Sequence, residues 1–372
     1  MRARRRTVVI VIVLLLVVAL IAGMLYQRYR HPRLYRATVL PLWLGTELDP
    51  HAVNDRGQVV GLISGTGGGS HLFLWDREKG VQDLGAVRGK RCDINNDGWI
   101  VGTMTGPNGL DQAFRRDPNG AVEFLGDFGG PSTADAINNL GQVVGHAVEI
   151  AARDAMQAFH AYLWDPEDGM RRLPHCGGRI TWATDISDTG KILGYTHVPG
   201  LGPPSLRRHP HYWSPDDPFN DEGTPTPGRD YFGMSDQGWV VGRHFFARSG
   251  PYVVAWQDFA GLEKLFPYSL EERVLEQPVM MINDANQVVY SEEHHSRWED
   301  YSAKLFAPRQ RWRLWDRTRG KVPLDPYLPR RTQRFELRDL NNHGCILGVA
   351  HLKDKRTHLA VLLEPITERW EQ

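Results

Sequence analysis

The sequence has no surplus of charge of either sign. Its 372 residues carry 44 Lys and Arg against 44 Asp and Glu, so the formal net charge is zero. No groove of basic residues with interleaved aromatic residues is visible either. Both features that favour nucleic-acid binding are therefore missing, and we do not expect nucleic acid as a partner.

Cysteine is scarce, and familiar catalytic signatures are missing. The three cysteines, Cys92, Cys176 and Cys345, are too widely spaced and too few for a disulfide framework or a metal-ligand cluster. Each is expected to be a small buried apolar residue. The chain also lacks a nucleophile elbow, a phosphate-binding loop, a zinc signature and a compelling carboxylate pair. The sequence therefore predicts neither a cofactor nor a bound metal.

Charge is absent from one long apolar run, residues 7–26, which follows the arginine-rich start 1–6. At about 1.5 Å per residue, such a helix spans roughly 30 Å, the thickness of a bilayer core. A cleaved signal peptide is the alternative, but its apolar region is usually only about 7–15 residues long. We predict an uncleaved single-pass membrane anchor. Because an arginine-rich start tends to stay in the cytoplasm, the rest of the chain is expected outside it.

The chain does contain an internal repeat of the type I-N-x-x-G-x-V-V-G. Seven copies occur at intervals of about 48 residues, at 53–61, 94–102, 137–145, 186–194, 234–242, 282–290 and 340–348. Asn or Ser offers a side-chain acceptor to a nearby backbone N–H, and Gly supplies the left-handed backbone of a type I turn with a bulge. Asn286 replaces Gly in the sixth copy, and asparagine tolerates that conformation best among other residues. A calcium loop is the alternative, but the acidic spacing does not fit one.

Each copy continues into a strand, a tight turn and another strand, as in HLFLWDREKGVQDLG (71–85). One unit therefore supplies four short strands. Apolar residues occupy consecutive positions in runs such as QVVG, so both faces of each small sheet must be covered. Radial repetition of such sheets covers both faces and leaves few exposed edges. The predicted fold class is all-β, a seven-bladed β-propeller of four-stranded blades preceded by one N-terminal transmembrane helix.

The two ends of the repeat region are expected to pair. The last unit stops at its third strand, 358–365, and residues 36–42 resemble the missing fourth strand. An unclosed array would leave two edges unpaired, so we predict that these segments share the last blade. The predicted domain organisation is a basic flank 1–6, an anchor 7–26, a juxtamembrane linker 27–34, a propeller 35–365 and a tail 366–372.

The repeat also resembles a known family. The alternation of A-x-x-I-N-x-x-G-x-V-V-G with H-A-F-L-W and a trailing D-L-G resembles the HAF repeat family of predicted extracellular repeat proteins. The matching segments are 136–145, 160–164 and 83–85, and the likeness extends over about residues 35–363. Copies five and six depart from it, with Tyr290 where the motif has Gly. The resemblance implies an extracytoplasmic, propeller-like domain and supplies no catalytic residues.

Three aspartates share one register of the repeat. Asp93, Asp185 and Asp339 each precede the first residue of the turn motif, in copies two, four and seven. If that strand is innermost, the three carboxyl groups face the central channel, where they could hold a cation or act in acid–base chemistry. The alternative is that each accepts hydrogen bonds from neighbouring backbone or from an arginine.

Departures from the repeat gather in copies four to six, at 197–230, 266–279 and 291–311. Insertions of this kind form loops, which often carry function. Two histidine pairs lie within these loops, and imidazole is a common metal ligand. Fifteen histidines make chance pairs common, so we predict ligand binding without a metal. The candidate ligand-binding residues are Asp93, Asp185, Asp339, His209, His211, His294 and His295.

The predicted function is a membrane-anchored, extracytoplasmic propeller that binds a protein or envelope polymer without catalysis, because no catalytic motif is present. The alternative is an extracytoplasmic hydrolase or lyase with its site at the central channel, since propellers host both kinds of function. A purely structural role in an envelope assembly is a third reading. Convergence of the three aspartates with a loop His or Arg in one pocket would favour the enzyme, whereas dispersed, hydrogen-bonded aspartates would favour binding.

Overall fold

The structure is a computed structural model that describes residues 34–43, 46–64, 69–150, 158–174, 180–197, 208–214, 229–246, 250–256, 263–267, 280–294, 309–354 and 357–366. The chain divides into two compact units, Met1–Arg36 with Glu364–Gln372, and Ala37–Leu363. In the first unit the backbone N–H of Ile366 donates to the carbonyl of Leu34 over 2.9 Å. The predicted anchor 7–26 lies outside the described residues. Among the described residues, no helix is long and apolar enough to span a membrane.

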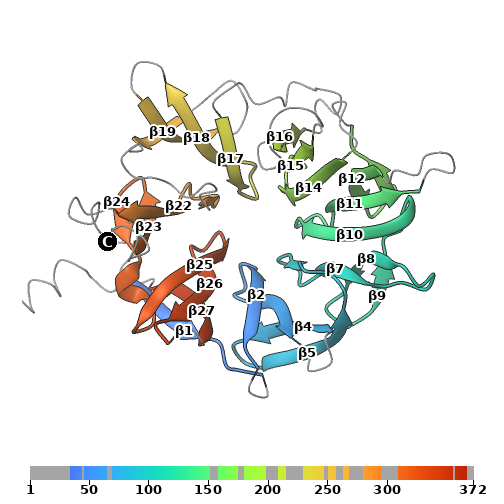
Figure 1. The fold of residues 1–372 in the computed structure, drawn as a ribbon, viewed down its shortest axis with the longest axis horizontal. Coiled ribbons are helices and arrows are strands. Elements are labelled where there is room, and N and C mark those ends of the chain that lie inside the picture. The colour runs from blue at the N-terminus through green and yellow to red at the C-terminus, as the bar shows by residue number, and fades with distance from the viewer. Residues whose placement is uncertain are drawn as a thin grey trace, which may run out of the picture. The chain divides into compact units, whose positions relative to one another are not determined.

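The second unit consists of small antiparallel sheets, one for each copy of the repeat (Figure 1). We call them blades 1 to 7. Blade 1 contains β2 (Leu48–Val53), β3 (Val59–Ser64), β4 (Ser70–Asp76) and β5 (Gly80–Val87). Blade 2 contains β6 (Asp93–Ile94), β7 (Ile100–Thr105), β8 (Asp111–Arg116) and β9 (Val122–Phe124). Blade 3 contains β10 (Gly129–Ile137), β11 (Val143–Glu149), β12 (Ala158–Asp165) and β13 (Gly169–Arg172).

The remaining blades follow the same plan within the described ranges. Blade 4 contains β14 (Ile180–Ile186), β15 (Ile192–His197) and β16 (Arg208–Trp213), and one parallel pairing of Phe159 with Ile180 joins it to blade 3. Blade 5 contains β17 (Arg229–Met234), β18 (Val240–Phe246), β19 (Gly250–Trp256) and β20 (Glu263–Pro267). Blade 6 contains β21 (Met280–Ile282), β22 (Val288–His294), β23 (Arg309–Asp316) and β24 (Gly320–Pro323). A short 3₁₀ turn, η3 (Asp325–Tyr327), precedes β25.

Blade 7 confirms the predicted pairing of the two chain ends. Its strand order is β1 (Tyr35–Val39), β27 (His358–Pro365), β26 (Ile346–Leu352) and β25 (Thr332–Leu340). The backbone N–H of Leu40 donates to the carbonyl of Ala360 over 2.9 Å. β1 thus forms the outer strand of blade 7 and pairs with the edge of β27, which would otherwise be exposed.

The seven turns of the repeat have the predicted geometry. Gly57, Gly98, Gly141, Gly190, Gly238 and Gly344 have φ between 75° and 85°, and Asn286 has φ 56°. In the first turn the backbone N–H of Gly57 donates to the carbonyl of Asn54 over 3.0 Å, as in a type I turn. Glycine reaches this left-handed region without steric cost, and Asn is its best substitute.

The hydrophobic core lies between neighbouring blades, as the consecutive apolar residues of the strands predict. Between blades 3 and 4, for example, Val144 and Leu163 pack with Ile186 and Ile192, and all four side chains are at most 4% exposed. Each sheet is therefore covered on both faces by its neighbours. The prediction of an all-β fold built of four-stranded sheets is confirmed. The strands β2, β10, β14, β17 and β25 run closest to the centre in Figure 1, and the residues of the site lie on these strands, at β6 or in the turns that follow them.

Candidate functional site

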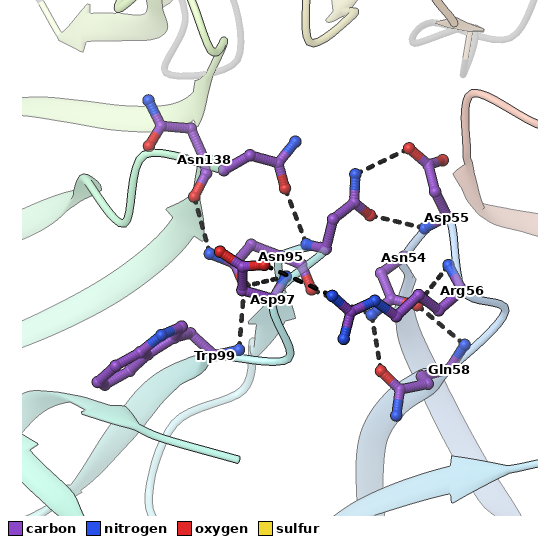
Figure 2. Close-up of polar contacts among 10 residues, drawn as sticks. Asn54, Asp55, Arg56, Gln58, Asn95, Asp97, Trp99 and Asn138 are labelled. Carbon is purple, nitrogen blue, oxygen red and sulfur yellow. Dashed lines mark hydrogen bonds and ion pairs between the residues drawn. The ribbon is translucent and has the colours of Figure 1, made fainter.

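The turn asparagines link each blade to the next. Figure 2 shows Asn54, whose Oδ1 accepts from the backbone N–H groups of Arg56 and Gln58, as predicted for this turn. Its Nδ2 donates to the carbonyl of Asn95 in blade 2 over 3.0 Å, a contact that the sequence did not indicate. The same donation runs from Asn95 to Asn138, from Asn138 to Ser187, from Asn283 to Asn341 and from Asn341 back to Asn54.

A second series of hydrogen bonds joins the residues that follow these asparagines. The backbone N–H of each donates to the side-chain oxygen of its counterpart in the next blade, over 2.7–3.0 Å. The pairs are Asp55 to Asn96, Asn96 to Asn139, Asn139 to Asp188, Asp284 to Asn342 and Asn342 to Asp55. Asn342 in blade 7 binds Asp55 in blade 1, so the series joins the last blade to the first, and it is interrupted only at blade 5.

Asp236 in blade 5 departs from this series. Its backbone carbonyl, and not its carboxylate, accepts from the N–H of Asp188 over 2.7 Å. Its carboxylate instead accepts from the Nδ2 atoms of Asn342 (2.8 Å) and Asn139 (3.3 Å), which belong to blades 7 and 3. A group that reaches turns on two distant blades lies over the centre of the propeller. Burial and the charges of Asp188, Asp284 and Asp55 raise the pKa of Asp236 to about 7.

The three aspartates of the shared register bind backbone. Asp93 accepts from the N–H of Ile94 in its own strand (2.8 Å) and from that of Ile137 in blade 3 (2.9 Å). Asp339 accepts in the same way from Leu340 (2.8 Å) and from Val53 in blade 1 (2.7 Å). Each carboxyl group therefore bridges two blades. This agrees with the alternative given for this register, in which each aspartate accepts hydrogen bonds from neighbouring backbone.

Asp185 follows the same pattern, with Ile186 as its neighbour in the strand (2.9 Å) and a backbone hydrogen bond from Met234 in blade 5. Burial raises the pKa of Asp93, Asp185 and Asp339 to about 7, against the opposing effect of these backbone N–H groups. Each of these side chains thus accepts backbone hydrogen bonds from its own blade and from the next.

Most of these groups, among them the three aspartates and Asp236, border one chamber of about 670 Å³. Carboxyl groups of Asp55, Asp93, Asp135, Asp185, Asp236 and Asp339 line it. Basic groups line it as well, from His51, Lys90, Arg91 and Arg338. The three predicted aspartates thus converge in one pocket with a histidine and arginines, which is the arrangement that favours an enzyme. Their role in ligand binding stays a prediction.

A histidine backed by a carboxylate lies in the chamber wall. His51 and Asp49 alternate along β2, and His51 Nε2 lies 3.5 Å from Asp49 Oδ2. Arg338 of β25 donates to the other carboxylate oxygen over 2.9 Å. Although burial raises the pKa of Asp49, the hydrogen bond from His51 and the charge of Arg338 hold it below its usual value. An ionised Asp49 orients His51 and leaves Nδ1 available as a base.

Sequence reasoning missed His51, Asp49 and Asp236. The first two form an Asp-x-His pattern on a strand, LDPHAV, which places both side chains on one face. This pattern is visible in the sequence, but three residues are too few to single it out. Asp236 has no local signal, because its turn MSDQG resembles ISDTG in blade 4. Only the closed ring directs its carboxylate to the centre.

The side chains of the predicted histidine pairs lie outside what the structure describes. His209 and His211 lie on β16, and His294 is the last residue of β22, but their side chains are outside the described part of the structure. His295 lies outside the described residues altogether. No group of three or more His, Cys, Asp or Glu side chains in the described ranges is arranged to hold a metal ion.

Comparison with solved structures identifies propellers of hydrolytic enzymes. The β-propeller domain of the Trilobed protease from Pyrococcus furiosus matches 87% of this chain and 92% of its own length, with a TM-score of 0.50 and 9% identity. Pyrococcus horikoshii acylaminoacyl peptidase matches 82% of this chain with a TM-score of 0.51 and 9% identity. Puromycin hydrolase matches 86% with a TM-score of 0.54 and 12% identity.

The chain spans about half of the last two proteins, 49% of the peptidase and 52% of the hydrolase. No protein-family model matches the chain, and no curated protein matches it. The structural likeness establishes the β-propeller fold. The prediction of a propeller that binds a partner without catalysis is wrong by this comparison, because these similar propellers occur in a protease, a peptidase and a hydrolase.

Proposed function

We propose that the chain is a seven-bladed hydrolase propeller that cleaves esters or amides of amine-bearing acyl groups in the central chamber. The observation that carries this proposal is the His51–Asp49 pair in the wall of a chamber that also holds the carboxyl group of Asp236. Hydrolysis of a cationic substrate requires a base and a separate acidic group in one chamber. Similarity to propellers of hydrolytic enzymes supports it.

His51 acts as the base. Its side chain is 11% exposed, so it is largely shielded from water, and Asp49 fixes which ring nitrogen faces the substrate. The positive charges of Lys90 and Arg91 line the same chamber and favour the negative charge that develops on a carbonyl oxygen. These groups therefore activate a nucleophile and stabilise the tetrahedral intermediate.

Asp236 holds the amine of the substrate. Its pKa of about 7 means that it is largely ionised above this pH, and Asp55 lies close enough to add negative charge. The ammonium group of a substrate neutralises the negative charge of Asp236 and Asp55. Hydrogen bonds between charged groups contribute about 1.5–3 kcal/mol, which corresponds to roughly 10- to 100-fold in affinity.

A matched pair of substrates tests the proposal. 4-Nitrophenyl 6-aminohexanoate and 4-nitrophenyl hexanoate differ only by an ammonium group that stays protonated well above neutral pH. We expect the full chain to hydrolyse both. The KM of the amino ester should fall as the pH rises from 6 to 8, because Asp236 ionises through about 7, and the KM of the neutral ester should not.

Asp236→Asn should raise the KM of the amino ester about 10- to 100-fold and remove its pH dependence. The matched control is Asp97→Asn, at the third position of the blade 2 turn, where the carboxylate is 68% exposed and pairs with Arg56. Hydrolysis of neither ester above the rate in buffer would refute the hydrolase proposal. Equal KM values for the two esters at every pH would refute the role of Asp236.

We also propose that residues 7–26 form an uncleaved anchor that holds the propeller outside the cytoplasm. The uncharged run behind an arginine-rich start supports this, as does the resemblance to the HAF repeat family. Protease added to intact cells should then digest the propeller. Protection in intact cells, together with digestion in opened cells, would place the propeller in the cytoplasm.

A further inference from the structure

A thiol completes the arrangement around His51. Cys92 Sγ lies 3.4 Å from His51 Nδ1, the ring nitrogen that Asp49 does not contact. The order of contacts is therefore thiol, imidazole, carboxylate, with Arg338 on the far oxygen of Asp49. Cys92, His51 and Arg338 all line the chamber. Nucleophile, base and orienting group in contact are the signature of nucleophilic catalysis.

The fold brings these residues together from three blades. Asp49 and His51 lie on β2 in blade 1, Cys92 immediately precedes β6 in blade 2, and Arg338 lies on β25 in blade 7. Cys92 is 5% exposed and packs with Ala52 and Ile94, which agrees with the expected small buried residue. Packing alone does not account for the polar contact of its sulfur with a histidine that itself lines the chamber.

We propose that Cys92 is the covalent nucleophile of the hydrolysis and that His51 activates it. This inference rests on the proposed function and adds the identity of the intermediate, a thioester on Cys92. Asp49 does not contact the substrate in this scheme. It is a positioning residue that keeps His51 Nδ1 directed at the sulfur.

The reaction balances without a redox partner. Sγ attacks the carbonyl carbon while its proton passes to His51 Nδ1, which gives a tetrahedral intermediate and an imidazolium. The bond to the leaving alcohol or amine breaks, and Nδ1 returns the proton to that group. Water then attacks the thioester and gives a proton to Nδ1, after which the acid leaves and Sγ regains its proton.

The environment of the thiol disfavours the thiolate, so the activation of Cys92 depends on His51 as the base. Burial, together with the negative charges of Asp93 and Asp49, raises the pKa of the Cys92 thiol well above its ordinary value. At neutral pH the resting group is therefore the thiol, and its proton leaves only as His51 takes it during attack. Cys92 should accordingly react slowly with iodoacetamide, yet acylate readily with a substrate that the chamber binds.

The test is acid-quenched mass spectrometry of the full chain, purified in detergent, after mixing with 4-nitrophenyl 6-aminohexanoate. We expect a mass gain of one acyl group, located on Cys92 by peptide mapping, and a burst of one equivalent of 4-nitrophenol. Cys345→Ser is the matched control, since Cys345 has no place in the chamber lining, and it should acylate like the unaltered chain.

Cys92→Ala should abolish the adduct and lower kcat by at least about 10³-fold. Alanine fits the apolar cluster, and the adduct in the unaltered chain decides the question even if this variant does not fold. Acylation of another residue, or steady turnover with no adduct and full activity in Cys92→Ala, would overturn the nucleophile and leave the hydrolase proposal intact. Absence of turnover in the unaltered chain itself would overturn both.

Discussion

At the scale of the residue, Gly145 of β11 allows the inner strand and the third strand of blade 3 to approach each other. A Cβ atom on Gly145 would overlap the carbonyl oxygen of Thr133 in β10. The hydroxyl of Tyr162 from β12 lies over the same glycine and donates to that carbonyl over 2.8 Å. The glycine of the V-V-G motif is therefore a packing requirement, and its φ is not positive.

In the sixth copy the glycine position itself holds an aromatic residue. Tyr290 occupies the glycine position and faces Arg313, where blade 3 has Gly145 facing Tyr162. The ring of Tyr290 packs on Phe266 of blade 5 at 4.7 Å between centroids and is 1% exposed. The aromatic group has thus moved from the third strand to the second.

We therefore predict that Gly145→Ala destabilises the propeller. Its methyl group would have to displace the Thr133 carbonyl or the Tyr162 ring, and overpacking of this kind costs about 1–3 kcal/mol. Urea unfolding followed by tryptophan fluorescence measures this loss. Gly69→Ala is the control, because a Cβ there meets no atom within 4 Å. Equal stability of the two variants would show that blade 3 can relax around the added methyl.

At the scale of the element, each aspartate of the shared register on one inner strand is matched by a small residue at the equivalent position of the next blade. Asp93 reaches into blade 3, where the equivalent position is Ala136, and Asp339 reaches into blade 1, where it is Ala52. Asp185 faces blade 5, where Gly233 holds the position. A small residue leaves room for the carboxyl group to reach the next backbone N–H. The alternation of Asp with Ala or Gly is thus a pairing rule between blades.

The same inner strands explain why the site lies at the centre. Each strand ends in a turn whose Asn or Ser binds its own backbone, and most of these turns bind the next turn as well. These turns bring polar groups of several blades to one chamber. Asp236, His51 and Cys92 are the groups of this chamber to which we assign the main chemistry.

At the scale of the whole molecule, the sequence predicted the architecture better than the site. Seven turns, the all-β class and the shared last blade follow from local turn chemistry and from apolar patterns, which need no knowledge of distant contacts. The register of Asp93, Asp185 and Asp339 was also visible. Their backbone partners were not, because each partner lies in the following blade.

The proposed catalytic arrangement could not be read from the sequence for a related reason. Cys92 and His51 are 41 positions apart and meet only because consecutive inner strands converge on one axis. Asp236 contacts residues 97 and 106 positions away. The prediction of a non-catalytic binding module rested on the absence of local motifs. In a ring of repeats, however, a site is assembled from single residues of several blades, so such an absence carries little weight.

The central claim, hydrolysis in the chamber with His51 as base, is tested most directly by comparing two histidine variants. His51→Gln removes the base, whereas His71→Gln alters a second His–Asp pair, His71 with Asp83 at 2.8 Å, that lies outside the chamber. General-base catalysis contributes about 10²- to 10⁴-fold, so kcat for the amino ester should fall by that factor in His51→Gln and stay unchanged in His71→Gln. Equal kcat values in the two variants would contradict the claim.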